Sequence, residues 1–246
     1  MIDLTGKRAL VTGGSRGIGA AIAQTLAENG ADVAFTYRNP AGEVEAVAGA
    51  IRAAGRRAAV IRADGADPAQ IARSVEEAVS ALGGLDILVN NAATGHYGMI
   101  ADLDPDDCQT VLNTNVRGPA LYAKAVIPHL GRGGRIVTIG SAAGERLPFA
   151  GITLYAMSKA ALGAFTRGLA RELGPRDITV NLVQPGSTDT ASNPADGPAA
   201  EAQAAATALG RYGTPREVAN AVAFLASPSA SVITGATLTA DGGAIA

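Results

Sequence analysis

The sequence predicts an α/β fold in which a parallel sheet is covered by helices on both faces. Two observations predict it. Short runs rich in Val, Ile and Leu alternate along the 246 residues with longer, Ala-rich segments of helical length, as in a chain of repeated strand–helix–strand units. The short runs are continuously apolar, which is typical of strands buried on both faces. No linker or change of composition divides the chain, so residues 1–246 are expected to form one domain.

Seven strands and six helical segments follow from this pattern. The strands are expected at Arg8–Thr12, Asp32–Tyr37, Ala58–Arg62, Ile87–Asn90, Arg135–Ile139, Thr179–Val183 and Thr237–Ala240. The helical segments lie near residues 17–29, 42–54, 68–82, 105–130, 153–173 and 215–226. Three of them share a start signal, because a capping side chain precedes a proline at the first helical position. These starts are Asp67-Pro68, Asp104-Pro105 and Thr214-Pro215. The result is a doubly wound sheet, whose ligand binds beyond the carboxyl ends of the strands.

Composition and charge exclude several classes of function. The formal net charge is −2 and aromatic residues make up 4% of the chain, so the basic surface and stacking platforms of nucleic-acid-binding proteins are not expected. The single cysteine, Cys108, excludes an intrachain disulfide framework, and no cluster of His, Asp, Glu or Cys has metal-ligand spacing. No signal peptide is recognised, and the uncharged stretch from Val218 to Ala240 is interrupted by Asn220 and Pro228. We therefore expect a cytoplasmic protein without a metal, nucleic-acid or membrane partner.

A glycine-rich turn follows the first predicted strand and opens the first predicted helix. It reads Thr-Gly-Gly-Ser-Arg-Gly-Ile-Gly over residues 12–19. Glycines at this junction let a pyrophosphate approach a helix N-terminus closely, which predicts a dinucleotide-binding Rossmann fold. The second strand ends without the acidic residue that an NAD site uses for the ribose 2′-hydroxyl. Arg16 and Arg38 are suited instead to a 2′-phosphate, so NADP is the expected cofactor unless both are solvated surface side chains.

A tyrosine and a lysine stand where acid–base chemistry is expected. Tyr155 and Lys159 are four residues apart on a predicted helix, so their side chains share one face. A nearby ammonium group stabilises a phenolate, and we expect Lys159 to lower the pKa of Tyr155 so that Tyr155 exchanges a proton with a substrate oxygen. Ser141 ends the fifth predicted strand and is expected at the same site, because ligands bind at the carboxyl ends of these strands.

Together these motifs resemble the short-chain dehydrogenase/reductase family over essentially the whole chain. The resemblance rests on the glycine turn, Asp64, Asn90-Asn91-Ala92-Ala93, Asn115, Ser141, Tyr155 with Lys159, and Pro185-Gly186-Ser187-Thr188. It implies that Tyr155 is the general acid or base, that Ser141 orients the carbonyl, and that Asn115 holds a water in a proton relay with Lys159. The implied cofactor-binding residues are Gly13, Ser15, Arg16, Gly17, Ile18, Gly19, Tyr37, Arg38, Asp64, Gly65, Asn91, Ala92, Ala93, Tyr155, Lys159, Pro185, Gly186 and Thr188.

Two positions depart from the family pattern. Ala93 replaces the last glycine of the usual Asn-Asn-Ala-Gly, and Gly65 replaces an apolar residue. Neither removes a catalytic group, so these departures concern the affinity for the cofactor more than the chemistry.

The resemblance implies an NADP-dependent oxidoreductase that acts on CH–OH groups and interconverts a ketone and a secondary alcohol. The pattern is most similar to 3-oxoacyl-[acyl-carrier-protein] reductases, so the substrate is a small carbonyl compound or a 3-oxoacyl thioester on an acyl carrier protein. Arg132 and Arg176 are expected near the site entrance, facing that acidic carrier. As an alternative, residues 184–198 resemble a cyclic-di-GMP-binding regulator built on a reductase scaffold, with or without reductase activity.

Three segments carry further expectations. Residues 189–210, rich in Ala, Pro and Gly, are expected to form a mobile lid over the site or a loop without function. Small residues along 153–173 would let another helix approach closely, and the resemblance implies homodimers or homotetramers. His96, in the loop after the fourth strand, either borders the substrate site or is simply solvated.

Overall fold

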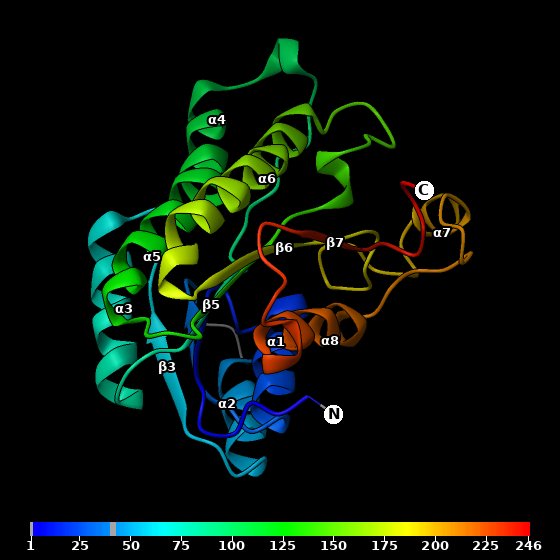
Figure 1. Ribbon diagram of the computed structural model, residues 1–246. Coiled ribbons are helices and arrows are strands. Elements are labelled where there is room, and N and C mark those ends of the chain that lie inside the picture. Colours follow the sequence, from blue (N-terminus) through cyan, green and yellow to red (C-terminus); the bar gives the residue numbers. More distant parts are fainter. Residues whose placement is uncertain (1, 40–42) are drawn as a thin grey trace.

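The computed structural model describes residues 2–39 and 43–246, and in these residues it contains one seven-stranded parallel sheet. The strand order is β3-β2-β1-β4-β5-β6-β7 (Figure 1), so the chain starts in the middle, runs to one edge and returns past β1 to the other. The strands are β1 Arg8–Val11, β2 Asp32–Tyr37, β3 Ala58–Arg62, β4 Ile87–Asn90, β5 Arg135–Ile139, β6 Thr179–Pro185 and β7 Thr237–Ala240. The predicted doubly wound sheet is confirmed, although β1 ends at Val11 and β6 continues to Pro185.

Helices cover both faces of the sheet, and each face has its own apolar core. On one face the core joins α1 Gly17–Glu28, α2 Glu43–Ala53 and α8 Pro215–Ala226 to the strands. On the other it joins α3 Pro68–Leu82, α5 Gly118–Val126 and α6 Thr153–Leu173. Burial on both sides explains the continuously apolar strands. Residue 42, the expected start of the second helix, lies outside the described residues.

The three predicted helix starts are confirmed. The Asp67 carboxylate accepts hydrogen bonds from two backbone N–H groups of the first turn of α3, at 2.8 and 3.2 Å. Asp104 accepts one at 2.8 Å at the start of α4, Pro105–Leu112. Thr214 and Glu217 form a capping box at the start of α8. Each cap satisfies N–H groups that have no partner inside the helix.

The predicted helix over 105–130 is interrupted. A π-helical turn, Asn113–Arg117, separates α4 from α5, and a 3₁₀ turn, Ile127–His129, follows α5. Pro119 has no N–H to continue the helical hydrogen bonds, and Gly118 lies against the Gly65 carbonyl so closely that a Cβ there would be 2.6 Å from the oxygen. The wider turn brings Asn115 toward the carboxyl ends of the strands.

The lid segment contains one short helix. This is α7, Ala200–Ala205, which lies near the C-terminus (Figure 1). In the part of the chain that the structure describes, none of the helices combines the length and apolar character needed to cross a membrane.

Candidate active site

The glycine turn between β1 and α1 is packed too closely for side chains. A Cβ at Gly14 would lie 2.6 Å from Cβ of Phe35, and one at Gly19 would overlap the Gly13 carbonyl oxygen and the Asn91 amide. Gly13 and Gly17 have φ values of 63° and 54°, in the left-handed region that favours glycine. The result is a bare backbone surface in front of the N-terminus of α1, which is suited to a phosphate group.

Side-chain hydrogen bonds fix this turn against the end of β4. Thr12 Oγ1 accepts from the backbone N–H groups of Asn91 and Ala92, both at 2.9 Å. The Asn91 amide donates to the carbonyl oxygens of Thr12 and Gly13 at 2.9 and 3.0 Å. These bonds join two loops that are far apart in the sequence into one rigid wall.

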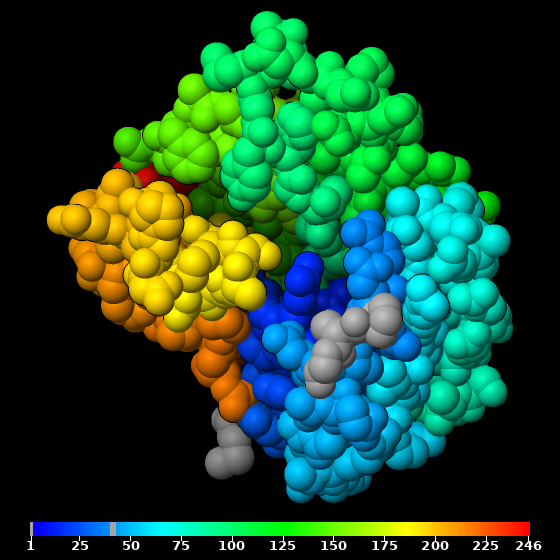
Figure 2. Space-filling view, turned by 180° about the vertical axis from the view of Figure 1, so that it is seen from behind, coloured from blue at the N-terminus to red at the C-terminus, as the bar shows by residue number. Residues whose placement is uncertain are grey.

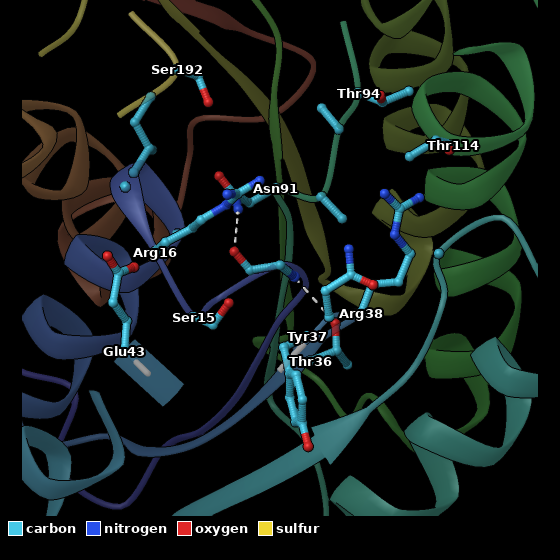
Figure 3. Close-up of a pocket in the computed structure, with 18 of the residues that line it drawn as sticks. Ser15, Arg16, Thr36, Tyr37, Arg38, Glu43, Asn91, Thr94, Thr114 and Ser192 are labelled. Carbon is cyan, nitrogen blue, oxygen red and sulfur yellow. Dashed lines mark hydrogen bonds between the residues drawn. The ribbon is translucent and has the colours of Figure 1, made fainter. Parts of the chain in front are cut away.

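A cleft of about 460 Å³ opens over this wall (Figure 3). Figure 2 shows the surface hollowed where the yellow residues near 190 meet the blue and green parts of the chain. Thirteen of the predicted cofactor-binding residues line the cleft, at positions 13, 15–19, 37–38, 64–65 and 91–93. The other five, Tyr155, Lys159, Pro185, Gly186 and Thr188, lie outside its lining.

The two arginines singled out in the sequence both line the cleft (Figure 3). Arg16 is the N-cap residue of α1 and its side chain makes no capping hydrogen bond, while Arg38 follows β2. Within the described residues, neither guanidinium forms an ion pair with a carboxylate. Among the acidic residues that line the cleft, Glu43 at the start of α2 is the nearest to Arg38 along the sequence. Both guanidinium groups are thus available to an anion.

The predicted catalytic side chains come together at the carboxyl end of β5. Ser141 follows β5, and α6 supplies Tyr155 and Lys159. The Ser141 hydroxyl lies near enough to Tyr155 to lower the pKa of its phenol. The Lys159 ammonium donates to the Ile139 carbonyl oxygen at 2.9 Å and lies 5.8 Å from the centre of the Tyr155 ring.

The pKa values of this group differ from the expectation. Burial raises the pKa of Tyr155, and the Ser141 hydroxyl only partly offsets that. Burial also lowers the pKa of Lys159 from 10.5 to about 8. The expected fall in the Tyr155 pKa is therefore wrong here, because the cost of removing the phenolate from water dominates. A phenol with a raised pKa stays protonated at neutral pH.

Asn115 braces the site from the π-helical turn. Its carboxamide accepts from the Thr94 N–H at 2.9 Å and donates to the Thr94 carbonyl at 2.8 Å. It also donates to Ser158 Oγ at 3.0 Å, next to Lys159 in α6. Asn115 is buried, at 1% exposure. The loop after β4, the π-helical turn and α6 are therefore joined through one side chain.

Comparisons of sequence and of structure find the same group of similar proteins. A family model described as enoyl-(acyl carrier protein) reductase matches residues 13–244. A short-chain dehydrogenase from Burkholderia cenocepacia, solved in complex with NADP, is 55% identical, with a TM-score of 0.97 over 99% of both chains. The short-chain dehydrogenase/reductase from Serratia marcescens is 51% identical, with the same TM-score and coverage. The chain belongs to the short-chain dehydrogenase/reductase family.

Two other relatives bear on the ligand of this short-chain dehydrogenase/reductase. The cyclic-di-GMP-binding biofilm dispersal mediator protein of Escherichia coli is 44% identical over 238 residues, which cover 97% of each chain. A blue fluorescent protein from a metagenomic library, solved in complex with NADPH, is 49% identical, with a TM-score of 0.97 over 99% of this chain and 100% of the other. The chain is therefore an oxidoreductase of this family.

The loop after β6 leads into the lid, whose residues Thr190, Ala191 and Ser192 line the cleft of this oxidoreductase. A Cβ at Gly186 would lie 2.7 Å from Cβ of Asp241, so the loop is packed on the C-terminal segment. Thr188 Oγ1 donates to the Gly186 carbonyl at 3.0 Å. Thr190 follows, and its Cγ2 lies 3.5 Å from the Cβ position of Gly17. The lid thus reaches across the cleft to the glycine turn.

Nine lining residues of the cleft were missed from the sequence. They come mainly from strand ends and from the lid: Thr36, Asn39, Glu43, Ala63, Thr94, Thr114, Thr190, Ala191 and Ser192. Thr36, Asn39, Ala63 and Thr94 adjoin residues that were predicted, so their sequence positions were a usable signal. Thr190, Ala191 and Ser192 fall in the segment expected to form a lid over the site, but no sequence signal singles them out, because their exact position depends on how the lid folds back.

The two family departures are accommodated. Ala93 lines the cleft. At Gly65 a Cβ would be 3.8 Å from Cβ of Ala92 and 4.0 Å from the Tyr122 ring, which are ordinary contacts. The glycine leaves space beside the cleft and distorts nothing.

The arginines expected to face a carrier protein are elsewhere. Arg132 precedes β5 and Arg176 precedes β6, so both lie at the amino ends of the strands, whereas Ser141 lies at the carboxyl end of β5. Arg176 donates to two backbone carbonyls, at 3.0 and 2.6 Å, and Arg132 pairs with Asp177 at 3.7 Å. The expectation that they lie near the entrance is wrong.

Proposed function

We propose that the chain is an NADPH-dependent reductase that converts a ketone into a secondary alcohol, with Tyr155 as the proton donor. The observation that carries this proposal is the meeting of Ser141, Tyr155 and the Lys159 ammonium beside the cleft. A regulator that only bound a ligand would not need a buried lysine next to a half-buried tyrosine, because burying a charge is costly.

The residues of the cleft fit a dinucleotide phosphate. The backbone of Gly13, Gly17 and Gly19 lines the cleft without side chains and would accept the pyrophosphate, and Asp64 lies in the cleft for the adenosine portion. Arg16 and Arg38 would hold the 2′-phosphate. The NADP and NADPH complexes of the relatives support this choice.

The proposed reaction follows from the side chains. The bound nicotinamide supplies the hydride. Ser141 donates a hydrogen bond to the ketone oxygen, and Tyr155 transfers its proton to that oxygen as negative charge develops there. The Lys159 ammonium, 5.8 Å from the Tyr155 ring centre, stabilises the phenolate that remains. Asn115 keeps the loop after β4 in place.

A second candidate is a cyclic-di-GMP-binding regulator on the same scaffold. It is favoured by the 44% identity with the Escherichia coli protein of that name. A calorimetric titration with cyclic-di-GMP, beside an NADPH-oxidation assay on a ketone panel, separates the two. Turnover without binding supports the reductase alone, and binding without turnover supports the regulator.

We further propose that the enzyme forms homodimers or homotetramers. Along α6, Ala160, Ala161, Ala164 and Gly168 are exposed, and such small residues allow another helix to come close. For the substrate we favour a free ketone over one carried on an acyl carrier protein. The two arginines that favoured the carrier, Arg132 and Arg176, lie at the amino ends of the strands, away from the site.

Tyr155→Phe tests the proposed chemistry. It removes the proton-donating hydroxyl and keeps the ring, so kcat should fall by about 10²–10⁴-fold while NADPH affinity stays nearly unchanged. The measurements are NADPH oxidation with an accepted ketone and a fluorescence titration of NADPH. Tyr122→Phe, which removes a phenol hydroxyl buried in the core on α5, is the control. Activity retained within about threefold in Tyr155→Phe would contradict the assignment.

A further inference from the structure

The loop after β4 carries Tyr97 at the carboxyl ends of the strands, where the loop after the neighbouring strand β5 carries Ser141. The loop is held on both sides, by Thr94 on Asn115 and by the Gly98 N–H, which donates to the Gly151 carbonyl at 2.9 Å. Between these points the Tyr97 ring folds over Gly95, where a Cβ would lie 3.3 Å from the ring. Its phenol is close enough to Tyr155 to raise the pKa of that residue. Tyr97 is nevertheless 74% exposed.

The charged side chains around this position are engaged elsewhere. Residues 94–99 and 141–151 contain three ionisable charged groups, His96, Glu145 and Arg146. His96 Nδ1 lies 3.4 Å from the Asp107 carboxylate of α4. Glu145 accepts from the Gln184 amide at 3.3 Å, and Arg146 donates to the Ala244 carbonyl at 3.2 Å.

The remaining large side chains of the two loops are apolar and open to solvent. Tyr97 and Met99 come from the loop after β4, and Leu147 and Phe149 from the loop after β5, with exposures between 49% and 74%. The Gly98–Gly151 hydrogen bond ties these loops together, two residues after Phe149. Exposed apolar side chains gathered at a reaction site mark a surface that a ligand covers.

We propose that Tyr97 is a specificity-determining residue, and that the substrate is an uncharged ketone whose aryl or alkyl group packs on Tyr97, Leu147 and Phe149. This inference rests on the proposed function. It identifies the substrate by what the rim recognises: apolar surface beside the carbonyl, with no dedicated counter-ion for a carboxylate or phosphate.

The first test compares matched ketones with the wild-type protein and NADPH. For methyl ketones from butanone to octanone, kcat/KM should rise about fourfold for each added methylene, until the rim is filled. The kcat/KM for 5-oxohexanoate, which ends in a carboxylate, should be lower than that for 2-heptanone by on the order of 100-fold. The carboxylate would lose its hydration on binding and gain no cationic partner in return.

The second test changes the rim itself. Tyr97→Ala should lower kcat/KM for acetophenone by about tenfold or more, mainly through KM, and change butanone by less than about threefold. Tyr97→Phe keeps the ring and should behave as wild type. Val232→Ala is the control, because Val232 is apolar, 90% exposed and precedes the amino end of β7. It should leave kcat/KM for both ketones unchanged.

Binding without turnover separates the two ways of failing. In Tyr155→Phe loaded with NADPH, quenching of NADPH fluorescence by acetophenone should require about tenfold more ketone once Tyr97→Ala is added. If no ketone binds or is reduced, the proposed function fails and this inference with it. If ketones are reduced but 5-oxohexanoate equals 2-heptanone, or if Tyr97→Ala affects all substrates equally, only this inference is overturned.

Discussion

Lys159 is the residue at which function and stability conflict most directly. It is 3% exposed, and its ammonium has one hydrogen-bond acceptor among the described residues, the Ile139 carbonyl. Burial lowers its pKa from 10.5 to about 8. A buried cation with so little compensation is costly, and its position beside Tyr155 is the proposed reason to retain it.

Lys159→Met should therefore stabilise the fold at pH 7 while impairing catalysis. The lowered pKa corresponds to about 3 kcal/mol, and the lost hydrogen bond subtracts about 1. Between pH 8 and 10.5 the unfolded wild-type chain binds the proton that the folded chain has lost, so wild-type stability should rise with pH across this window. Urea unfolding at several pH values should show this rise in wild type and in Lys124→Met, which replaces an exposed lysine, but not in Lys159→Met. A less stable Lys159→Met at pH 7 would contradict the burial argument.

Arg38 is expected to select the phosphorylated cofactor. Arg38→Ala should weaken NADPH binding by about 10- to 100-fold and leave NADH binding nearly unchanged, because a charge-assisted hydrogen bond to the 2′-phosphate is lost. Fluorescence titration with both cofactors measures the two dissociation constants. Arg73→Ala, which removes an exposed arginine paired with Glu77 on α3, serves as the control. Equal weakening of both cofactors would mean that Arg38 does not contact the 2′-phosphate.

At the scale of elements, the lid is attached by a small group of amide and hydroxyl side chains. Gln203 of α7 accepts from Ser187 Oγ at 2.7 Å and from the Asn193 amide at 3.1 Å, and it donates to Asn193 at 3.2 Å. Tyr212 adds a bond to Asn193 at 3.3 Å. These bonds join both ends of the segment that reaches Gly17 across the cleft.

Gln203→Ala should loosen the lid without unfolding the chain. Losing three part-buried hydrogen bonds should raise the NADPH dissociation rate by about tenfold and speed proteolysis within residues 189–210. Stopped-flow displacement and limited proteolysis measure the two effects. Gln109→Ala removes a comparable amide bond on α4, away from the lid, and should leave both rates unchanged. An unchanged dissociation rate in Gln203→Ala would show that these bonds do not hold the lid over the cofactor.

At the scale of the whole molecule, the exposed small residues of α6 lie on the same helix as Tyr155 and Lys159. Self-association through this helix would therefore couple assembly to the geometry of the active site. The helix holds the reacting side chains on its buried side and presents Ala161 and Ala164 to solvent.

Ala164→Arg should shift the protein toward smaller species. A long charged side chain prevents close approach of two helices and leaves a charge unpaired at the contact. Sedimentation velocity at several concentrations compares wild type, Ala164→Arg and Ala53→Arg, which adds the same charge to an exposed position on α2. Identical sedimentation of all three proteins would place the subunit contact elsewhere.

The sequence by itself determined the order of strands and helices, the three capped helix starts and the glycine turn. These features depend on local chemistry, such as apolar runs, prolines after capping residues and glycines at a strand–helix junction. Spacing along one helix likewise put Tyr155 and Lys159 on one face. Most of the cleft could thus be predicted, since loops at the carboxyl ends of neighbouring parallel strands must meet.

Only the tertiary structure decided the features that depend on distant contacts. The π-helical turn is held by the hydrogen bond between Asn115 and Thr94. The lid lies near Gly17, held by the hydrogen bonds of Gln203 with Ser187 and Asn193. Burial sets the direction in which the pKa of Tyr155 is shifted. Arg132 and Arg176 lie away from the site for a related reason. In a parallel sheet, residues that precede the strands lie at the amino ends, opposite the carboxyl ends where the site forms. Local sequence cannot encode these outcomes, because desolvation and long-range hydrogen bonds are properties of the folded surroundings.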